Sequence, residues 1–150
     1  MDLSHMAPSM RIVKLSRSEF PDLKNARSFF LSELPARKPP GKFCVTEARI
    51  SRSSGLATDD YLVFTFNRRI IFTARSDSRL QLNAGEHRET HPWCFTVKLA
   101  TLSETDVEIE ALEHKCIQLG MKPTNVASSQ GWNRLPASPQ VDDLWMWLRE

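Results

Sequence analysis

The sequence is poor in cysteine and has no long apolar run, and both shortages exclude classes of protein. Only three of its 150 residues are cysteines, Cys44, Cys94 and Cys116, and no two of them have CxxC spacing. An odd number of widely spaced cysteines argues against a disulfide framework and against a zinc site, and it favours a reducing, cytoplasmic compartment. No apolar segment reaches the roughly 18–20 residues that a bilayer span needs, and no secretory signal is visible, so we expect no membrane partner.

The common catalytic signatures are also missing. The sequence contains no GxSxG, no P-loop and no GxGxxG. His87 and His91 are four residues apart, but Gly85 and Pro92 flank them, which argues against a helical pair of metal ligands. In the segment 106–115, acidic residues alternate with apolar ones, which is typical of a solvent-facing strand rather than a nuclease centre. We therefore expect no cofactor, no metal and no catalytic centre in this chain.

The charge is unevenly distributed along the chain. The net charge is only +2, yet residues 37–98 hold 11 basic and 6 acidic side chains, whereas residues 99–150 hold 4 basic and 8 acidic ones. Most of the basic residues in the middle are arginines, which bind phosphate groups through two parallel hydrogen bonds. This pattern favours one face that meets a polyanion such as nucleic acid, with an ordinary solvated surface as the alternative.

Hydrophobic periodicity predicts a helix first and strands after it. The opening MDLSHM resembles a cloning remnant, so residues 1–9 are left out and residues 10–150 are taken as one domain. A helix is predicted over residues 16–34, with Ser18 or Asp22 as its N-cap. Its buried face would carry Leu23, Ala26, Phe30 and Leu34. The proline-rich segment 35–42 ends it.

The rest of the chain predicts a series of short strands and two short helices. The clearest signal is a β-hairpin over residues 61–74 that turns at Asn67-Arg68. The other expected strands are 42–50, 80–82, 92–102 and 106–109. A helix from Glu110 to Gly120 and a loop with short strands over 121–140 follow them. The last element is a helix over 141–150 whose buried face is Leu144, Trp147 and Leu148. No regular βαβ alternation is present, so we predict an α+β fold, a small mixed β-barrel with flanking helices.

Two tryptophans fall outside the regular elements or at their ends. Trp132 lies in the loop sequence GWNRLP, and Trp93 follows a proline at a strand start. Proteins that read an extruded base stack it on aromatic side chains, read its edge with polar groups and hold the flanking phosphates with arginine. Packing in the core is the alternative for both residues, and Trp145 and Trp147 in the last helix are expected to pack or to form an interface.

Three stretches resemble the PUA-like superfamily, which contains the EVE, ASCH and YTH domains. They are residues 41–75, residues 91–112 and GWNRLP. The resemblance implies a domain that reads a modified base, such as a methylated one, by base flipping, similar to the specificity modules of modification-dependent restriction systems. By position, the pocket would be formed by Arg49, Ser51, Ser53 and Trp132, with Trp93 as a wall. Arg52, Asn133 and Arg134, adjacent to these in the sequence, complete the predicted nucleic-acid-binding set. DNA is expected more than RNA, with a nuclease as a partner chain or fused domain.

Three alternatives stay open at this point. Some ASCH-type domains hydrolyse nucleic acid or nucleosides, and such a site would use lysine or glutamate inside the pocket. A protein-interaction domain is a second alternative, in which DDLWMWLRE docks a partner or a second copy to form a homodimer. A third is a B3-like pseudobarrel, which reads the major groove of DNA without flipping a base.

Overall fold

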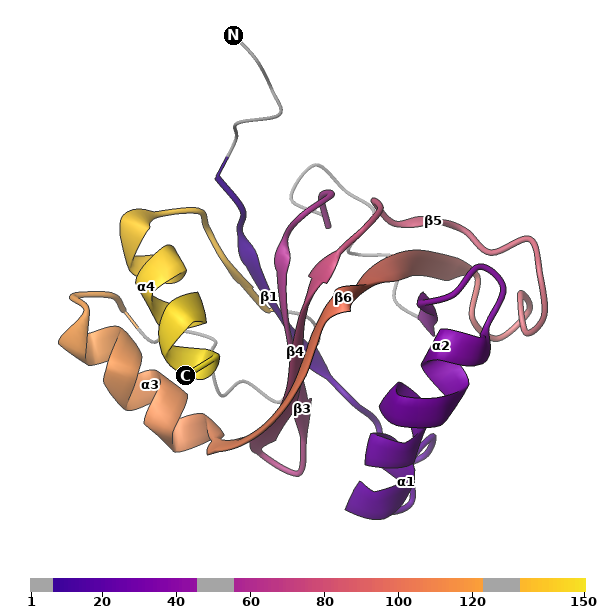
Figure 1. The fold of residues 1–150 in the computed structure, drawn as a ribbon, viewed down its shortest axis with the longest axis horizontal. Helices are drawn as coiled ribbons and strands as arrows, with labels where there is room; N and C mark the ends of the chain where they lie inside the picture. The colour runs from indigo at the N-terminus through magenta and orange to yellow at the C-terminus, as the bar shows by residue number, and fades with distance from the viewer. Residues whose placement is uncertain (1–6, 46–55, 123–132) are drawn as a thin grey trace, which may run out of the picture.

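The computed structural model describes residues 7–45, 56–122 and 133–150, which form strands and short helices (Figure 1). In chain order they are β1 (Met10–Lys14), α1 (Leu23–Ser28), the π-helical η2 (Phe29–Glu33), α2 (Leu34–Ala36), β2 (Lys42–Val45), β3 (Tyr61–Phe66), β4 (Arg69–Ser76), β5 (Gln81–Leu82), β6 (Trp93–Glu108), α3 (Ile109–Gln118), β7 (Asn133–Leu135) and α4 (Pro139–Leu148).

The strands form one mixed sheet that curls into a half-barrel. Their order is β2-β6-β4-β3-β1-β7, and β5 also pairs with β6. β1 runs parallel to β3, and all the other pairs are antiparallel. β2 and β3 are separated by two strands, yet the rings of Phe43 and Phe64 lie 5.5 Å apart, which requires the sheet to bend back on itself. The predicted α+β barrel with flanking helices is confirmed.

The β3–β4 hairpin forms where the sequence predicts it. Its turn residues Asn67 and Arg68 both have positive φ, 51° and 63°, as a type I′ turn requires. The guanidinium of Arg68 donates two hydrogen bonds, of 3.0 and 2.6 Å, to one carboxylate oxygen of Glu110 at the start of α3. The turn is therefore fixed to the following helix.

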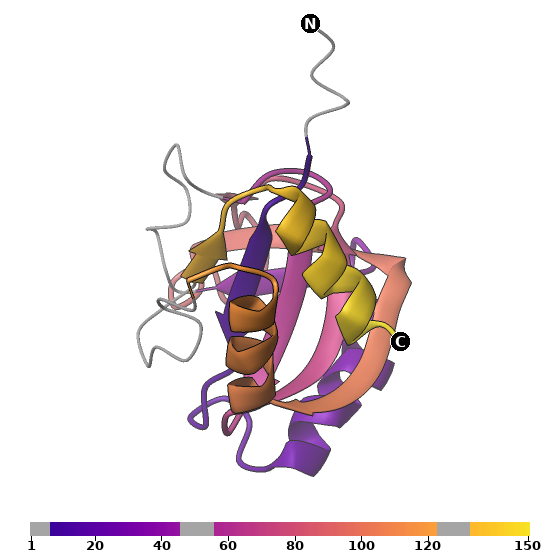
Figure 2. The ribbon, with the colours of Figure 1, turned by 90° about the vertical axis from the view of Figure 1, so that its left-hand side faces the viewer.

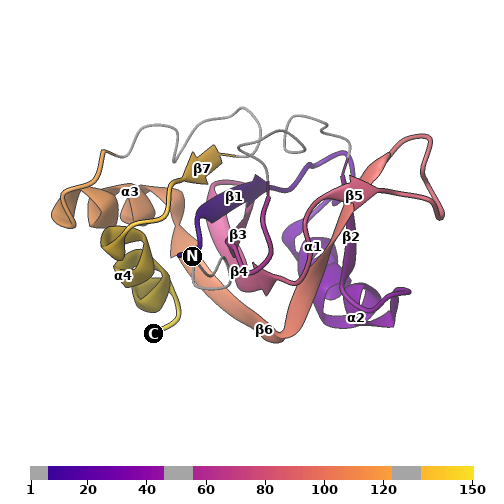
Figure 3. The same ribbon diagram turned by 90° about the horizontal axis from the view of Figure 1, so that it is seen from above.

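β6 is longer than the sequence predicts. The prediction of two separate strands, 92–102 and 106–109, is wrong, because the pairing of β6 with β4 continues to Glu108. The first residues of β6 pair with β2 on one side and β5 on the other, and later residues pair with β4 (Figure 3). Its predicted apolar face is confirmed: Phe95 and Val97 are buried, and Trp93 and Leu99 pack against the same core.

Helices cover both faces of the sheet and create two separate hydrophobic cores. Figure 1 shows α1 and α2 on one side of the strands and α3 and α4 on the other, and Figure 2 looks onto the α3–α4 side. The first core joins the α1–α2 segment to β2, β3, β4 and β6, and five phenylalanine rings stack or meet edge to face within it: Phe29, Phe30, Phe43, Phe64 and Phe72. The second core joins α3 and α4 to β1, β3 and β4.

The first helix begins later than expected. Asp22 is its N-cap, and its carboxylate accepts the amide of Asn25 at 2.8 Å, so the predicted start at residue 16 is wrong. The residues before the cap form a turn that buries Phe20. The predicted face is confirmed, since Ala26, Phe30 and Leu34 are fully buried.

The buried tryptophan of α4 is Trp145, not Trp147 as predicted. Trp145 stacks on Tyr61 with ring centroids 4.5 Å apart and an interplanar angle of 14°. The guanidiniums of Arg75 and Arg149 cover the outer faces of this pair, at 4.9 Å from Tyr61 and 4.6 Å from Trp145. Trp147 is only partly buried, and the ammonium of Lys115 lies 5.9 Å from its ring. A four-membered cation–aromatic stack thus fixes α4 to the sheet.

We predict that Phe30→Ala destabilises the fold far more than the neighbouring Leu31→Ala. Phe30 is fully buried among four other rings, so its truncation should cost about 3–5 kcal/mol. Leu31 is 57% exposed on the same π-helical turn, and its truncation should change stability by less than about 0.5 kcal/mol. Urea unfolding of the two variants measures both values, and similar losses would contradict the assigned core.

We also predict that the phenol of Tyr61 ionises only at unusually high pH. Burial, together with its 2.8 Å hydrogen bond to Asp142, raises the pKa of Tyr61 to about 12. The stabilisation from this neutral phenol is complete below pH 10 and is lost as pH rises through about 12. Tyr61 is the only tyrosine, so near-ultraviolet tyrosinate absorbance reports it alone.

Asp142→Asn should lower the midpoint of that titration, because the carboxylate no longer disfavours the tyrosinate. An ordinary midpoint in the native protein, or one that Asp142→Asn leaves unmoved, would show that the phenol does not have this environment.

Candidate nucleic-acid interface

The predicted nucleic-acid-binding residues divide into those that the structure describes and those that it does not. Arg49, Ser51, Arg52, Ser53 and Trp132 lie outside the described residues. Asn133 begins β7, where its backbone pairs with Ile12 of β1. Trp93 and Arg134 are described with their side chains.

Arg134 lies opposite a second arginine. It sits in β7 directly across from Arg11 in β1, and its guanidinium donates a 3.0 Å hydrogen bond to the Ser9 hydroxyl. Arg11 is only 4% exposed, whereas Arg134 is exposed. Ser9, the last residue of the segment left out of the sequence-based fold, is itself buried. Like charges directly opposite on neighbouring strands destabilise a sheet, so this pair requires compensation.

The carboxylate of Asp60, the residue before β3, provides that compensation. It is 4% exposed, and its two carboxylate oxygens accept the backbone amides of Ser9 at 3.0 Å and Ala57 at 2.8 Å. The carboxylate is thereby held near both arginines, each of which favours its ionised form. The group combines one buried carboxylate, one buried guanidinium and one exposed guanidinium.

The pKa values reflect this crowding. Burial, and next the positive charge of Arg134, lower the pKa of Arg11 to about 10, although Asp60 acts in the opposite direction. Burial raises the pKa of Asp60, against the effect of its two amide donors and both arginines. At neutral pH, Arg11 stays protonated, and the cluster presents the exposed guanidinium of Arg134 to solvent.

Trp93 has a structural role at the start of β6. It pairs with Val45 of β2 and Leu82 of β5, and its half-buried side chain packs against the first core. The interpretation that Trp93 is a core residue is therefore supported, and a role as a pocket wall stays a prediction. Val45, its partner, is the last described residue before the segment predicted to line the pocket.

Four of the described basic residues in the middle segment, Arg68, Arg69, Arg75 and Lys98, bond to acceptors close to them in the fold. Arg68 and Arg69, in the β3–β4 hairpin, bond to three carboxylates at the end of β6 and the start of α3. Asp106, Glu108 and Glu110 of the acidic segment are thus ionic partners of the hairpin. Arg75 bonds through its guanidinium to the Asp59 carbonyl, and Lys98 bonds to the Asp59 carboxylate.

No metal or membrane feature occurs in the part of the chain that the structure describes. There, no group of three or more histidine, cysteine, aspartate or glutamate side chains is placed to hold a metal ion. The imidazole of His91 bonds to the Glu19 carboxylate at 2.5 Å. α3 and α4 have 10 residues each, and no described helix has the length and apolar character of a bilayer span.

The comparison with solved structures identifies the architecture. The YTH domain of the Zygosaccharomyces rouxii MRB1 protein, solved in complex with N6-methyladenosine RNA, matches with a TM-score of 0.54. The match has 17% sequence identity and covers 95% of this chain and 85% of that one. The chain adopts a YTH-like fold. No protein-family model and no curated protein matches the sequence. The likeness therefore bears on the fold alone.

Ser9, Arg11, Asp60 and Arg134 together form an arginine cluster. Of its members, Ser9, Arg11 and Asp60 were not predicted from the sequence. One signal was available for Arg11, since it is the single charge inside the otherwise apolar run MRIV. No local pattern connects it with Asp60 or Arg134, because they are about 50 and 120 residues away along the chain. Their meeting depends on the parallel pairing of β1 with β3 and on the edge position of β7.

We predict that removing Arg134 stabilises the fold only when Asp60 is neutralised. Asp60→Asn should destabilise the fold by about 3 kcal/mol, because buried Arg11 loses its opposite charge. In the native background Arg134→Gln should change stability little, since the residue is exposed. In the Asp60→Asn background it should stabilise, because it removes the like charge beside Arg11. Urea unfolding of the four proteins measures the coupling, and additive effects would refute it.

Proposed function

We propose that this chain is a nucleic-acid-binding domain that recognises a methylated base extruded from its strand. The observation that carries the proposal is the fold likeness to a YTH domain that was solved with N6-methyladenosine RNA. The aromatic, serine and arginine residues near GWNRLP and in the segment 49–53 give this fold the side chains that base recognition needs.

Each predicted residue has a definite role in this proposal. Trp132 stacks on the extruded base, and Trp93 borders the pocket from the start of β6. Ser51, Ser53 and Asn133 hydrogen-bond the edge of the base. Arg49, Arg52 and Arg134 bind the phosphates on either side of it, a role that the exposed position of Arg134 supports.

The kind of nucleic acid is the second part of the proposal. The resemblance to modules of modification-dependent restriction systems favours DNA, with the cleaving activity on a partner chain or fused domain. The structural neighbour was solved with RNA, and the methylated base there is N6-methyladenosine. N6-methyladenine in single-stranded DNA and RNA is therefore the first ligand to test, with methylated and hydroxymethylated cytosine next.

We predict that the protein binds one methylated oligonucleotide at least tenfold more tightly than the same unmethylated strand. Trp132→Ala should abolish this preference, because stacking of a base on an aromatic side chain contributes about 1–3 kcal/mol. Fluorescence anisotropy of matched methylated and plain DNA and RNA strands, at two salt concentrations, measures the preference. Trp147→Ala is the control, since this tryptophan lies on α4 beside Lys115 and outside the predicted pocket.

Equal, salt-sensitive affinity for every strand would reduce the proposal to a backbone binder. A preference that survives in Trp132→Ala would overturn the role of that residue. No binding to any strand would reject the proposed function as a whole.

A further inference from the structure

A cleft of about 510 Å³ lies between α2, β2 and the loop that joins β5 to β6. Its volume is within the usual range of ligand sites, about 300–1,000 Å³. The charged groups that line it are Arg37, Lys38, Lys42, Glu33 and Glu86, together with His87. Cations thus exceed carboxylates, and none of these residues belongs to the arginine cluster described above.

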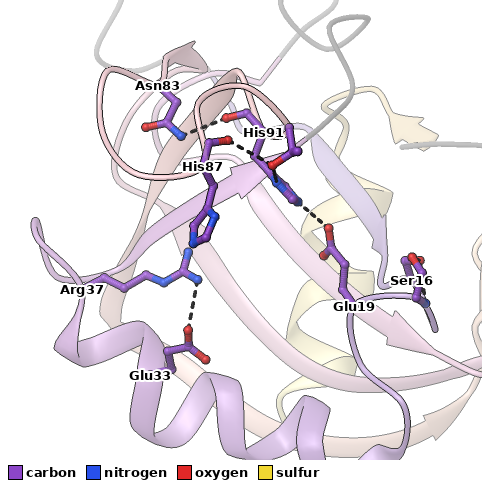
Figure 4. Close-up of polar contacts among 9 residues, drawn as sticks. Ser16, Glu19, Glu33, Arg37, Asn83, His87 and His91 are labelled. Carbon is purple, nitrogen blue, oxygen red and sulfur yellow. Dashed lines mark hydrogen bonds and ion pairs between the residues drawn. The ribbon is translucent and has the colours of Figure 1, made fainter.

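The loop that forms one wall is held in a fixed shape. The buried Asn83 side chain donates hydrogen bonds of 2.9 Å to the carbonyls of Glu86 and His91, and it accepts the amide of Gly85 at 3.0 Å. His91 in turn bonds to Glu19, which fastens the loop to the segment before α1 (Figure 4). These bonds fix the shape of the wall.

Within this frame, His87 has a positive φ of 62° and points toward Arg37 (Figure 4). A non-glycine residue in the left-handed region is unusual and is maintained only where the surroundings fix it. Here the amide of His91 donates a 2.7 Å hydrogen bond to the His87 carbonyl. The loop backbone thus directs the imidazole into the cleft.

The opposite wall holds Arg37 in a single orientation. Its guanidinium lies 4.8 Å from the Phe29 ring, donates a 3.2 Å hydrogen bond to the Lys42 carbonyl, and contacts Glu33 at 3.3 Å. Glu33 is 63% exposed at its side chain, so this ion pair is largely solvated and its net attraction is weak. A guanidinium fixed in this way gives up little conformational entropy when it binds an anion.

Lys42 brings an ammonium against the loop backbone. A β-carbon at Gly85 would lie 2.9 Å from the Lys42 ammonium nitrogen, so the absence of a side chain at Gly85 leaves room for the charge. Lys38 lines the same cleft from the segment after α2. Two lysines and an oriented arginine that line one cleft make a site for an anion with several oxygens.

We propose that this cleft binds a phosphate group, separately from the base pocket. The phosphate belongs to the polynucleotide of the proposed function or to a free nucleotide, and both present the same oxygens to Arg37, Lys38 and Lys42. In the polynucleotide case the cleft supplies affinity without selecting the base, as phosphate contacts do. That case rests on the proposed function, whereas binding of the phosphate group itself does not.

The test compares Lys42→Gln and Lys38→Gln with Lys24→Gln, which removes the same charge from exposed α1 outside the cleft. With oligonucleotides, each cleft variant should lose about three- to tenfold in affinity, equally for methylated and plain strands. The slope of log affinity against log salt should fall by about 0.7 for a single strand. Lys24→Gln should leave affinity and slope unchanged, and the melting temperature of each variant checks its folding.

A second arm uses inorganic phosphate and adenosine monophosphate, followed through the backbone amide NMR signals of Gly85 and His87. Saturable shifts in the native protein that disappear in Lys42→Gln support the cleft even if no oligonucleotide binds, and then the source is a free phosphate compound. Unchanged oligonucleotide affinity in both lysine variants, together with amide signals that phosphate does not shift, would overturn the proposal of phosphate binding in the cleft. This holds whether or not a methylated strand is preferred. An equal loss in Lys24→Gln would also overturn it, because the effect would then be one of general charge.

Discussion

The half-barrel depends on β6, a strand that pairs with three others. Its register with β4 shifts twice, between Ile70 and Phe72 and between Thr73 and Arg75. Such bulges bend a strand and increase its twist. Because β6 bends, it brings β2 back over the sheet until Phe43 reaches Phe64, and the phenylalanines of η2 fill the enclosed space. Without this strand, β2 and β5 would have no partner among the described strands.

The same core fixes the surroundings of the proposed pocket. Val45 and Leu56, the residues on either side of the segment 46–55, are both buried in the first core. A segment whose two ends are anchored in one core loses less entropy on binding than a freely attached one. Under the proposed function, the packing of Phe30 and its neighbours therefore bears on binding as well as on stability.

Local patterns in the sequence predict those parts of the fold that depend on neighbours in the chain. The hairpin at Asn67-Arg68, the apolar face of Phe95 and Val97 and the buried face of α1 were all available from spacing alone. β1 was missed because its pairing is with β3, about 50 residues away, and a five-residue strand gives little periodic signal. Trp145 was misjudged in favour of Trp147 for a similar reason, since its orientation is set by Tyr61.

For the candidate site, the sequence supplied Arg134 but not its surroundings. A count of charges treats every arginine as equivalent, whereas in the structure the arginines differ in the groups that they bond to. Arg68 and Arg69 bond to nearby carboxylates, and a paired charge contributes little to the field that attracts a polyanion.

Arg11 and Arg134 instead share one buried carboxylate between two guanidiniums, so that group keeps a net positive charge. The same reasoning applies to the cleft beside Arg37, where the partner carboxylate is solvated. In these two groups of described residues, positive charge exceeds the neighbouring negative charge. In the proposed function, the salt dependence of binding should accordingly follow these cations together with Arg49 and Arg52, and not the total number of basic residues.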